Sequence, residues 1–148
     1  MNKHFVANEL LCVAKLISNS IPEPITDDNK KAILHEILAE IKNIVGGTAI
    51  FRGENYLQFN NSDKFSMLGM HVETEYPRLH KPGFISLDQI YMHEEWKRKG
   101  EQGPATLLYK KLGEIAKKYG DGKLHVYSAG EHSAQKKFWD RVPNVVFD

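Results

Sequence analysis

Two spacings of hydrophobic residues divide the chain into a helical part and a strand-rich part. In residues 4–18, and again in a segment ending at Val45, apolar side chains recur every three or four positions, as in amphipathic helices. Thr26 or Asp27 is expected to cap the start of the second helix, and Gly46 its end. Its predicted buried stripe is Leu34, Ile37, Leu38, Ile41 and Val45. Residues 1–46 therefore predict a pair of helices.

From residue 47 onward the pattern becomes typical of strands. Residues 48–52 and 55–60 flank a turn at Gly53 and predict a hairpin. Residues 65–75 alternate between the two faces of a half-buried strand. One face carries the apolar residues Leu68, Met70 and Val72. The other face carries Met67, His71, Glu73 and Glu75. Residues 76–83, with two prolines, predict a loop.

The rest of the chain alternates strands with helices. Residues 84–92 predict a strand, and Pro104 suits the first position of a helix that runs to residue 119. The inward residues of that helix are expected to be Leu107, Leu108, Leu112, Ile115 and Ala116. A strand at 123–127, a helix at 131–141 and a strand at 144–147 follow. The order α-α-β-β-β-β-α-β-α-β predicts one α/β (α+β) domain over residues 1–148, with helices flanking a sheet.

Charge and cysteine content exclude several classes of protein. The formal net charge is +1, so no overall electrostatic attraction to nucleic acid is expected. Cys12 is the single cysteine and cannot form an internal disulfide, which suits a reducing compartment. No apolar run approaches the roughly 20 residues that cross a bilayer, and Glu9 and Lys15 interrupt the N-terminal apolar residues. We therefore expect a soluble, cytoplasmic protein with no membrane partner.

The loop at residues 96–103 is the strongest chemical signal. It carries lysine, arginine and glycine between the end of a strand and the start of a helix. The first N–H groups of a helix have no partner inside it, and the helix dipole favours an anion there. We expect the amides of residues 100–106 to converge on a phosphate group. The alternative is a solvated basic turn, because loops with glycine and lysine are common.

Residues 88–139 resemble the core of the GCN5-related N-acetyltransferase (GNAT) superfamily. The strand end at Met92 with its basic loop, the sequence Gly103-Pro104-Ala105, and Ala134 followed by Phe138 and Trp139 carry the resemblance. It implies a mixed, mainly antiparallel sheet, with an acyl-CoA-binding core within residues 47–148 and acetyl-CoA as cosubstrate. The implied cofactor-binding residues are Tyr91, Met92, Arg98, Lys99, Gly100, Gln102, Gly103, Ala105, Thr106 and Phe138.

The sequence departs from the family pattern in its loop and its last helix. If Gly103 is used, the family's leading arginine or glutamine falls on Gly100, so Arg98, Lys99 or Gln102 would supply that contact. The aromatic pair contains no tyrosine to protonate the leaving thiolate, so Tyr127 or water is the substitute. The usual asparagine of the last loop is replaced by Glu131.

Transfer of an acetyl group to an amine also requires a group that accepts the amine's proton. Asp88 is the first candidate, followed by Glu73, Glu75 and His71, although the pattern favours a solvated charge on the sheet face for each of them. His93, Glu94 and Glu95 do not predict a metal site, because adjacent side chains of an extended segment point apart. The expected acceptor is an unidentified amine, either a small molecule or a protein lysine or N-terminus.

Two other functions stay open at this point. The chain could be a GNAT-like binding module without catalysis, or it could bind or modify nucleic acid. The second alternative rests on basic helix surfaces formed by Lys110, Lys111, Lys117, Lys118, Lys136 and Lys137. The segment 9–16 also resembles openings of accessory proteins of bacterial viruses. A sheet edge near Phe147 could be covered by a second copy in a homodimer.

Overall fold

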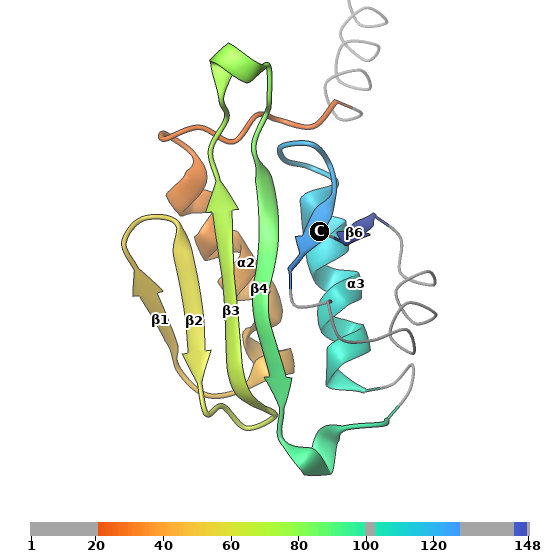
Figure 1. Ribbon diagram of the computed structural model, residues 1–148. Coiled ribbons are helices and arrows are strands. Elements are labelled where there is room, and N and C mark those ends of the chain that lie inside the picture. The colour runs from red at the N-terminus through yellow and green to blue at the C-terminus, as the bar shows by residue number, and fades with distance from the viewer. Residues whose placement is uncertain (1–20, 100–102, 128–143, 148) are drawn as a thin grey trace, which may run out of the picture.

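The computed structural model describes residues 21–99, 103–127 and 144–147 (Figure 1). The predicted helices at 4–18 and 131–141 lie outside these ranges. In chain order the elements are α2 (Lys30–Val45), β1 (Ala49–Arg52), β2 (Tyr56–Asn60), β3 (Phe65–Glu73), β4 (Phe84–Met92), α3 (Pro104–Ala116), β5 (Leu124–Val126) and β6 (Val145–Phe147). Two short 3-10 turns, Pro77–Leu79 and Glu94–Trp96, flank β4.

The six strands form one mixed sheet in the order β1-β2-β3-β4-β5-β6. Strands β1 to β4 are antiparallel, whereas β5 pairs parallel to β4 and β6 parallel to β5. The prediction of a mixed sheet combined with helices is confirmed. The parallel pairing of β4 with β5 is short, because it joins only residues 85–87 to residues 124–126.

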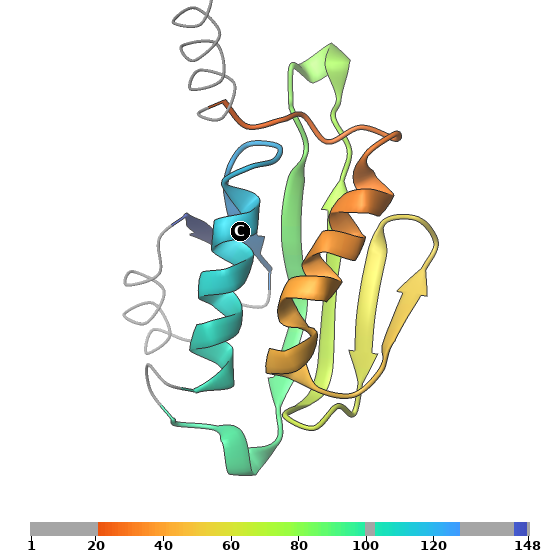
Figure 2. The ribbon, with the colours of Figure 1, turned by 180° about the vertical axis from the view of Figure 1, so that it is seen from behind.

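Helices α2 and α3 both pack on one face of this sheet (Figures 1 and 2). The core lies between these two layers. It contains the helical residues Ile37, Ile41, Leu108 and Leu112 and the strand residues Leu57, Phe59, Leu68, Met70, Leu87 and Val126. The opposite face of the sheet, here called the open face, is not covered by either of these helices. The alternation predicted for residues 65–75 is confirmed, because Leu68, Met70 and Val72 are buried in this core.

The start of α2 differs from the prediction. The helix begins at Lys30 rather than at Thr26 or Asp27. The backbone N–H of Thr26 donates to Asn29 Oδ1 at 2.7 Å, and Asn29 Nδ2 donates to the Pro24 carbonyl at 2.8 Å. These side-chain bonds form a turn ahead of the helix. The predicted end is confirmed, because Gly46 adopts φ 74° and donates to the Lys42 carbonyl at 2.9 Å.

The inward face of α3 also differs from the prediction at one position. Leu107 is 46% exposed, whereas Tyr109 is only 6% exposed. Successive helical residues are about 100° apart, so a stripe that contains the buried residues Leu108, Leu112 and Ala116 extends to position 109 and leaves position 107 outside it. Among the described helices, none combines the length and the hydropathy that a membrane span requires.

Candidate functional site

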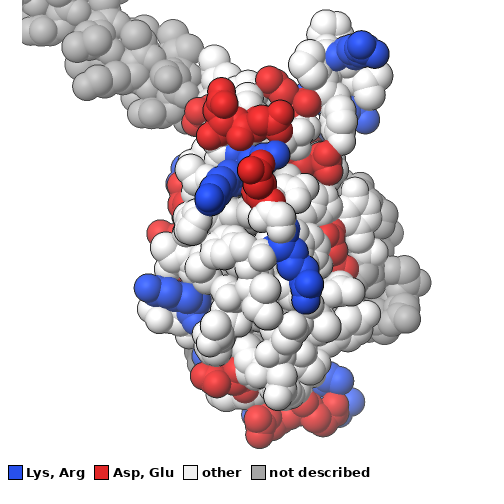
Figure 3. Space-filling model, turned by 90° about the vertical axis from the view of Figure 1, so that its left-hand side faces the viewer, with Lys and Arg blue, Asp and Glu red and all other residues white. Residues whose placement is uncertain are grey.

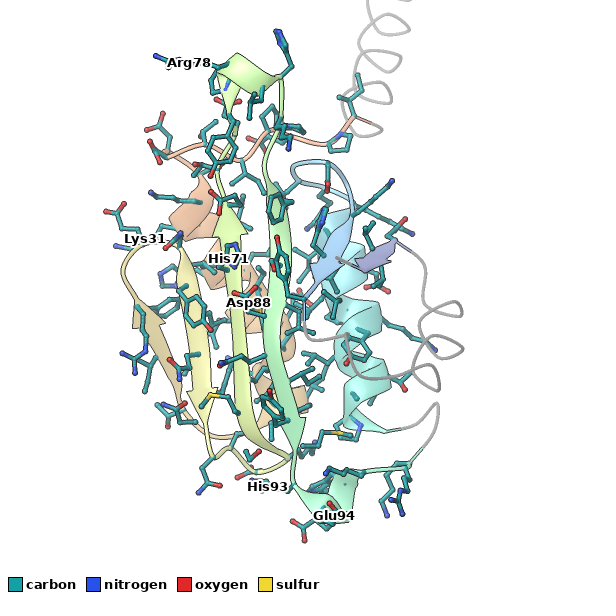
Figure 4. All side chains as sticks on the ribbon, in the orientation of Figure 1. Lys31, His71, Arg78, Asp88, His93 and Glu94 are labelled. Carbon is teal, nitrogen blue, oxygen red and sulfur yellow. The ribbon has the colours of Figure 1, made fainter. Side chains whose placement is uncertain are left out.

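Polar side chains gather on the open face where β3 meets β4. The pairing register places His71 between Tyr56 of β2 and Ser86 of β4. The register of β3 and β4 then shifts by one residue: Met70 is opposite Leu87, whereas Gly69 is opposite Gln89. Asp88 is the extra residue of this β-bulge. Because Ile85 and Leu87 are buried in the core, regular alternation places Ser86 and Asp88 on the open face, and the bulge brings Gln89 to that face as well. His71 and Asp88 lie side by side on the two strands (Figure 4).

These side chains form a hydrogen-bonded network. The Nδ1 atom of His71 lies 2.6 Å from Asp88 Oδ2, and Ser86 Oγ donates to Asp88 Oδ1 at 2.6 Å. On its other side, His71 Nε2 lies 3.4 Å from Glu73 Oε2. The Tyr76 hydroxyl donates to Glu73. The imidazole is therefore held between two carboxylates.

Partial burial makes the charges of this network interact strongly. The side chains of His71, Asp88 and Glu73 are 19%, 23% and 26% exposed. Burial alone would lower the pKa of His71, but the hydrogen bond and charge of Asp88 and the charge of Glu73 outweigh it and raise that pKa above its ordinary value. The two carboxylates thus favour a positive charge between them, on the His71 imidazole.

The predicted phosphate loop follows β4. Arg98 and Lys99 are exposed, and Arg98 adopts a positive φ of 62°. Lys97 pairs with Glu94 at 2.9 Å. Helix α3 begins after Gly103, and no side chain from the described residues caps it. Arg98 and Lys99 therefore precede the N-terminus of α3 in the chain, and the intervening residues, which include Gly100 and Gln102, lie outside the described residues.

The other predicted cofactor-binding residues have different surroundings. Tyr91 is 58% exposed and lies on the open face, beyond the bulge. Met92 and Ala105 pack against the core, and Thr106 is 4% exposed. Contacts of Ala105 and Thr106 with an anion would therefore be made through the backbone of the first helical turn. Phe138 lies outside the described residues.

The backbone of Tyr127 lies beside β4, close to the β-bulge. Its N–H donates to the carbonyl of Leu87 at 3.2 Å, which continues the β4–β5 pairing up to the residue before Asp88. Its side chain is 46% exposed. The structure thus brings three of the predicted candidates, Asp88, Glu73 and Tyr127, to neighbouring strands. Glu75 lies just beyond the end of β3, where its N–H donates to the Ile25 carbonyl at 2.6 Å.

Sequence reasoning missed three residues beside this network. Tyr56, Gly69 and Gln89 lie on β2, β3 and β4, on the same open face. The signal that could have found them is the glycine inside a strand, because such a glycine often marks a close approach of neighbouring groups.

Two further features bear on the alternatives. His93 Nε2 donates to the Ser62 carbonyl at 2.8 Å, and the described residues contain no group of histidine, cysteine or acidic side chains placed to hold a metal ion. Of the lysines on α3, Lys111 pairs with Glu40 at 3.5 Å, and Lys118 beyond the helix pairs with Glu36 at 2.7 Å. Seen from the β1 edge, both signs of charge are mixed on the surface (Figure 3). Glu36 and Glu40 of α2 therefore neutralise part of the predicted basic helix surface.

The comparisons with known proteins identify no family. No protein-family model matches the sequence, and no curated protein or solved structure matches it either. The fold and the site define a mixed α+β protein whose open sheet face carries an acid–imidazole network at a β-bulge. The resemblance to the GNAT superfamily stays a prediction.

Proposed function

We propose that this protein is a GNAT-like, acyl-CoA-dependent N-acyltransferase that moves an acetyl group from acetyl-CoA to an amine. The observation that carries the proposal is the course of β4. This strand carries Asp88, which bonds His71, and its end leads through residues 97–99 toward the N-terminus of α3. A proton-accepting group and an anion-binding element therefore follow one another along one strand, loop and helix.

The network can activate an amine. A protonated amine has no lone pair for attack on a thioester, so its proton must first be removed. We propose that molecules in which the His71 imidazole is neutral take up this proton, with His71 and Asp88 acting as one coupled unit. Ser86 orients the carboxylate, and Glu73 stabilises the imidazolium that forms. The new C–N bond then forms as the C–S bond breaks, and the departing thiolate takes a proton from Tyr127 or from water. The nitrogen of the new amide gives up its second proton, which restores that proton donor.

The cofactor would lie along β4 and the following loop. Beyond Leu87, β4 pairs with β3 on one side, whereas its pairing with β5 has ended. The N–H and C=O groups of residues 88–92 that face away from β3 can bond the amides of the pantetheine arm. Arg98, Lys99 and the first amides of α3 would hold the pyrophosphate, with about 1.5–3 kcal/mol for each charge-assisted hydrogen bond.

Calorimetric titration with acetyl-CoA tests the cofactor site. Lys99→Glu reverses one charge in the proposed cradle, and Lys31→Glu makes the same change on the exposed surface of α2. We expect Lys99→Glu to weaken binding about tenfold or more, which corresponds to about 1.4 kcal/mol. Lys31→Glu should leave the affinity unchanged. Absence of binding by the unaltered protein would refute the proposal.

Turnover separates an enzyme from a binding module. Release of the CoA thiol can be followed with a panel of amines once binding is established. Release that depends on an added amine supports the acyltransferase function. Binding of acetyl-CoA without amine-dependent release from any member of the panel would instead favour the catalytically inactive module.

A further inference from the structure

Gly69 allows a tyrosine from β2 to reach β4. A Cβ atom placed on Gly69 would lie 2.2 Å from Tyr56 Oη and 3.4 Å from Gln89 Oε1. The first distance is far below a van der Waals contact, so the Tyr56 ring can cross β3 only because residue 69 has no side chain. The phenol of β2 and the carboxamide of β4 are thereby brought together over one backbone position of β3.

The third group at this point is Asp88, which precedes Gln89 at the bulge. Burial raises the pKa of Tyr56, and the charge of Asp88 raises it further, although Arg52 acts in the opposite direction. Both effects favour the protonated phenol. Gln89 is exposed and Tyr56 half-buried, so solvent reaches both side chains.

We propose that Tyr56, Gln89 and Asp88 form the subsite that holds the primary ammonium group of the acceptor, a proposal that rests on the acyltransferase function above. A primary ammonium has three N–H donors and no acceptor, and these side chains offer three oxygens that accept. An ammonium bound there lies beside the His71–Asp88 pair that takes up its proton. Gly69 is required because a side chain at this position would displace the Tyr56 hydroxyl.

The subsite can be tested without acetyl-CoA by titrating n-butylammonium chloride into the full-length protein. The His71 imidazole resonance, assigned with His71→Gln, reports on a cation beside Asp88, and sodium chloride at equal ionic strength controls for screening. We expect a saturable shift in the unaltered protein. Tyr56→Phe and Gly69→Ala should each weaken the apparent affinity about tenfold, which corresponds to the loss of one charge-assisted hydrogen bond.

Tyr119→Phe is the matched control for removal of a hydroxyl. Tyr119 donates to Glu36 at 2.9 Å on the helical side of the sheet, so its loss should leave the n-butylammonium affinity unchanged. Tyr56→Phe retains the ring that covers Gly69, which keeps the test valid if Gly69→Ala fails to fold. Absence of a saturable shift, or equal affinity in the unaltered protein and Tyr56→Phe, would overturn the subsite.

The two proposals fail in different ways. If n-butylammonium binds with the expected dependence on Tyr56 while acetyl-CoA does not bind, the amine subsite stands and the acyltransferase function is wrong. If acetyl-CoA binds and supports amine-dependent release of CoA while n-butylammonium gives no saturable shift, the function stands and the subsite is wrong.

Discussion

Replacement of Asp88 by asparagine should destabilise the protein in a pH-dependent manner. The substitution keeps the size of the side chain and removes its charge. Asp88 bonds both His71 and Ser86 at 2.6 Å, and its side chain is 23% exposed. A hydrogen bond to a charged group contributes about 1.5–3 kcal/mol. We therefore expect Asp88→Asn to lower the free energy of unfolding by about 2 kcal/mol where His71 is protonated.

The sign of the pH dependence follows from the raised pKa of His71. Burial opposes this shift, but Asp88 and Glu73 outweigh it. Below the ordinary value of about 6.5, the imidazole is protonated in the folded and the unfolded protein, and its stabilisation by the carboxylates is complete. As the pH rises through the folded-state pKa, the imidazole loses its proton and this contribution is lost. The difference between the two proteins should therefore narrow toward alkaline pH.

Urea unfolding between about pH 5.5 and 9 measures this difference. With a slope of about 2 kcal/mol per molar urea, the expected change shifts the midpoint by about 1 M near pH 6. His71→Gln, which removes the titrating group, should flatten the pH dependence. A penalty for Asp88→Asn that stays constant, or that grows as the pH rises, would refute the charge-assisted pairing.

Two other predictions test the packing. Leu108→Ala should cost about 2–5 kcal/mol of unfolding free energy because Leu108 is fully buried, whereas Leu107→Ala should cost less than about 1 kcal/mol; equal losses in thermal unfolding would contradict the corrected face of α3. Gly83→Ala should cost about 3 kcal/mol, because Gly83 has a φ of 84° and a Cβ there would lie 2.4 Å from the Glu73 carbonyl oxygen. A melting temperature unchanged by Gly83→Ala would show that this contact relaxes.

The strands could be predicted closely because their pattern is local. The alternation in residues 65–75 specifies which side chains face the core, and residues 84–92 predict a strand on their own. The structure has β3 at Phe65–Glu73 and β4 at Phe84–Met92. The start of α2 could be predicted less accurately than the strands. Several residues around Thr26 can cap a helix, and the choice among them depends on the hydrogen bonds of Asn29.

The network on the open face could be predicted only in part. Alternation placed His71 and Glu73 on one face, but residues 71 and 88 are 17 positions apart, and their meeting depends on the register of β3 and β4. The bulge that brings Gln89 to the same face as Asp88 is a property of the paired strands. The approach of Tyr56 over Gly69 likewise involves two strands, so neither segment alone carries the signal.

The sheet topology also has a consequence for how the chain folds. Strands β1 to β4 pair with their sequence neighbours, so their contacts close short loops and can form early. The parallel pairing of residues 85–87 with residues 124–126 must wait until α3 has crossed between the two strands. We therefore expect the seam between β4 and β5, beside which the proposed catalytic groups lie, to be among the last contacts to form during folding.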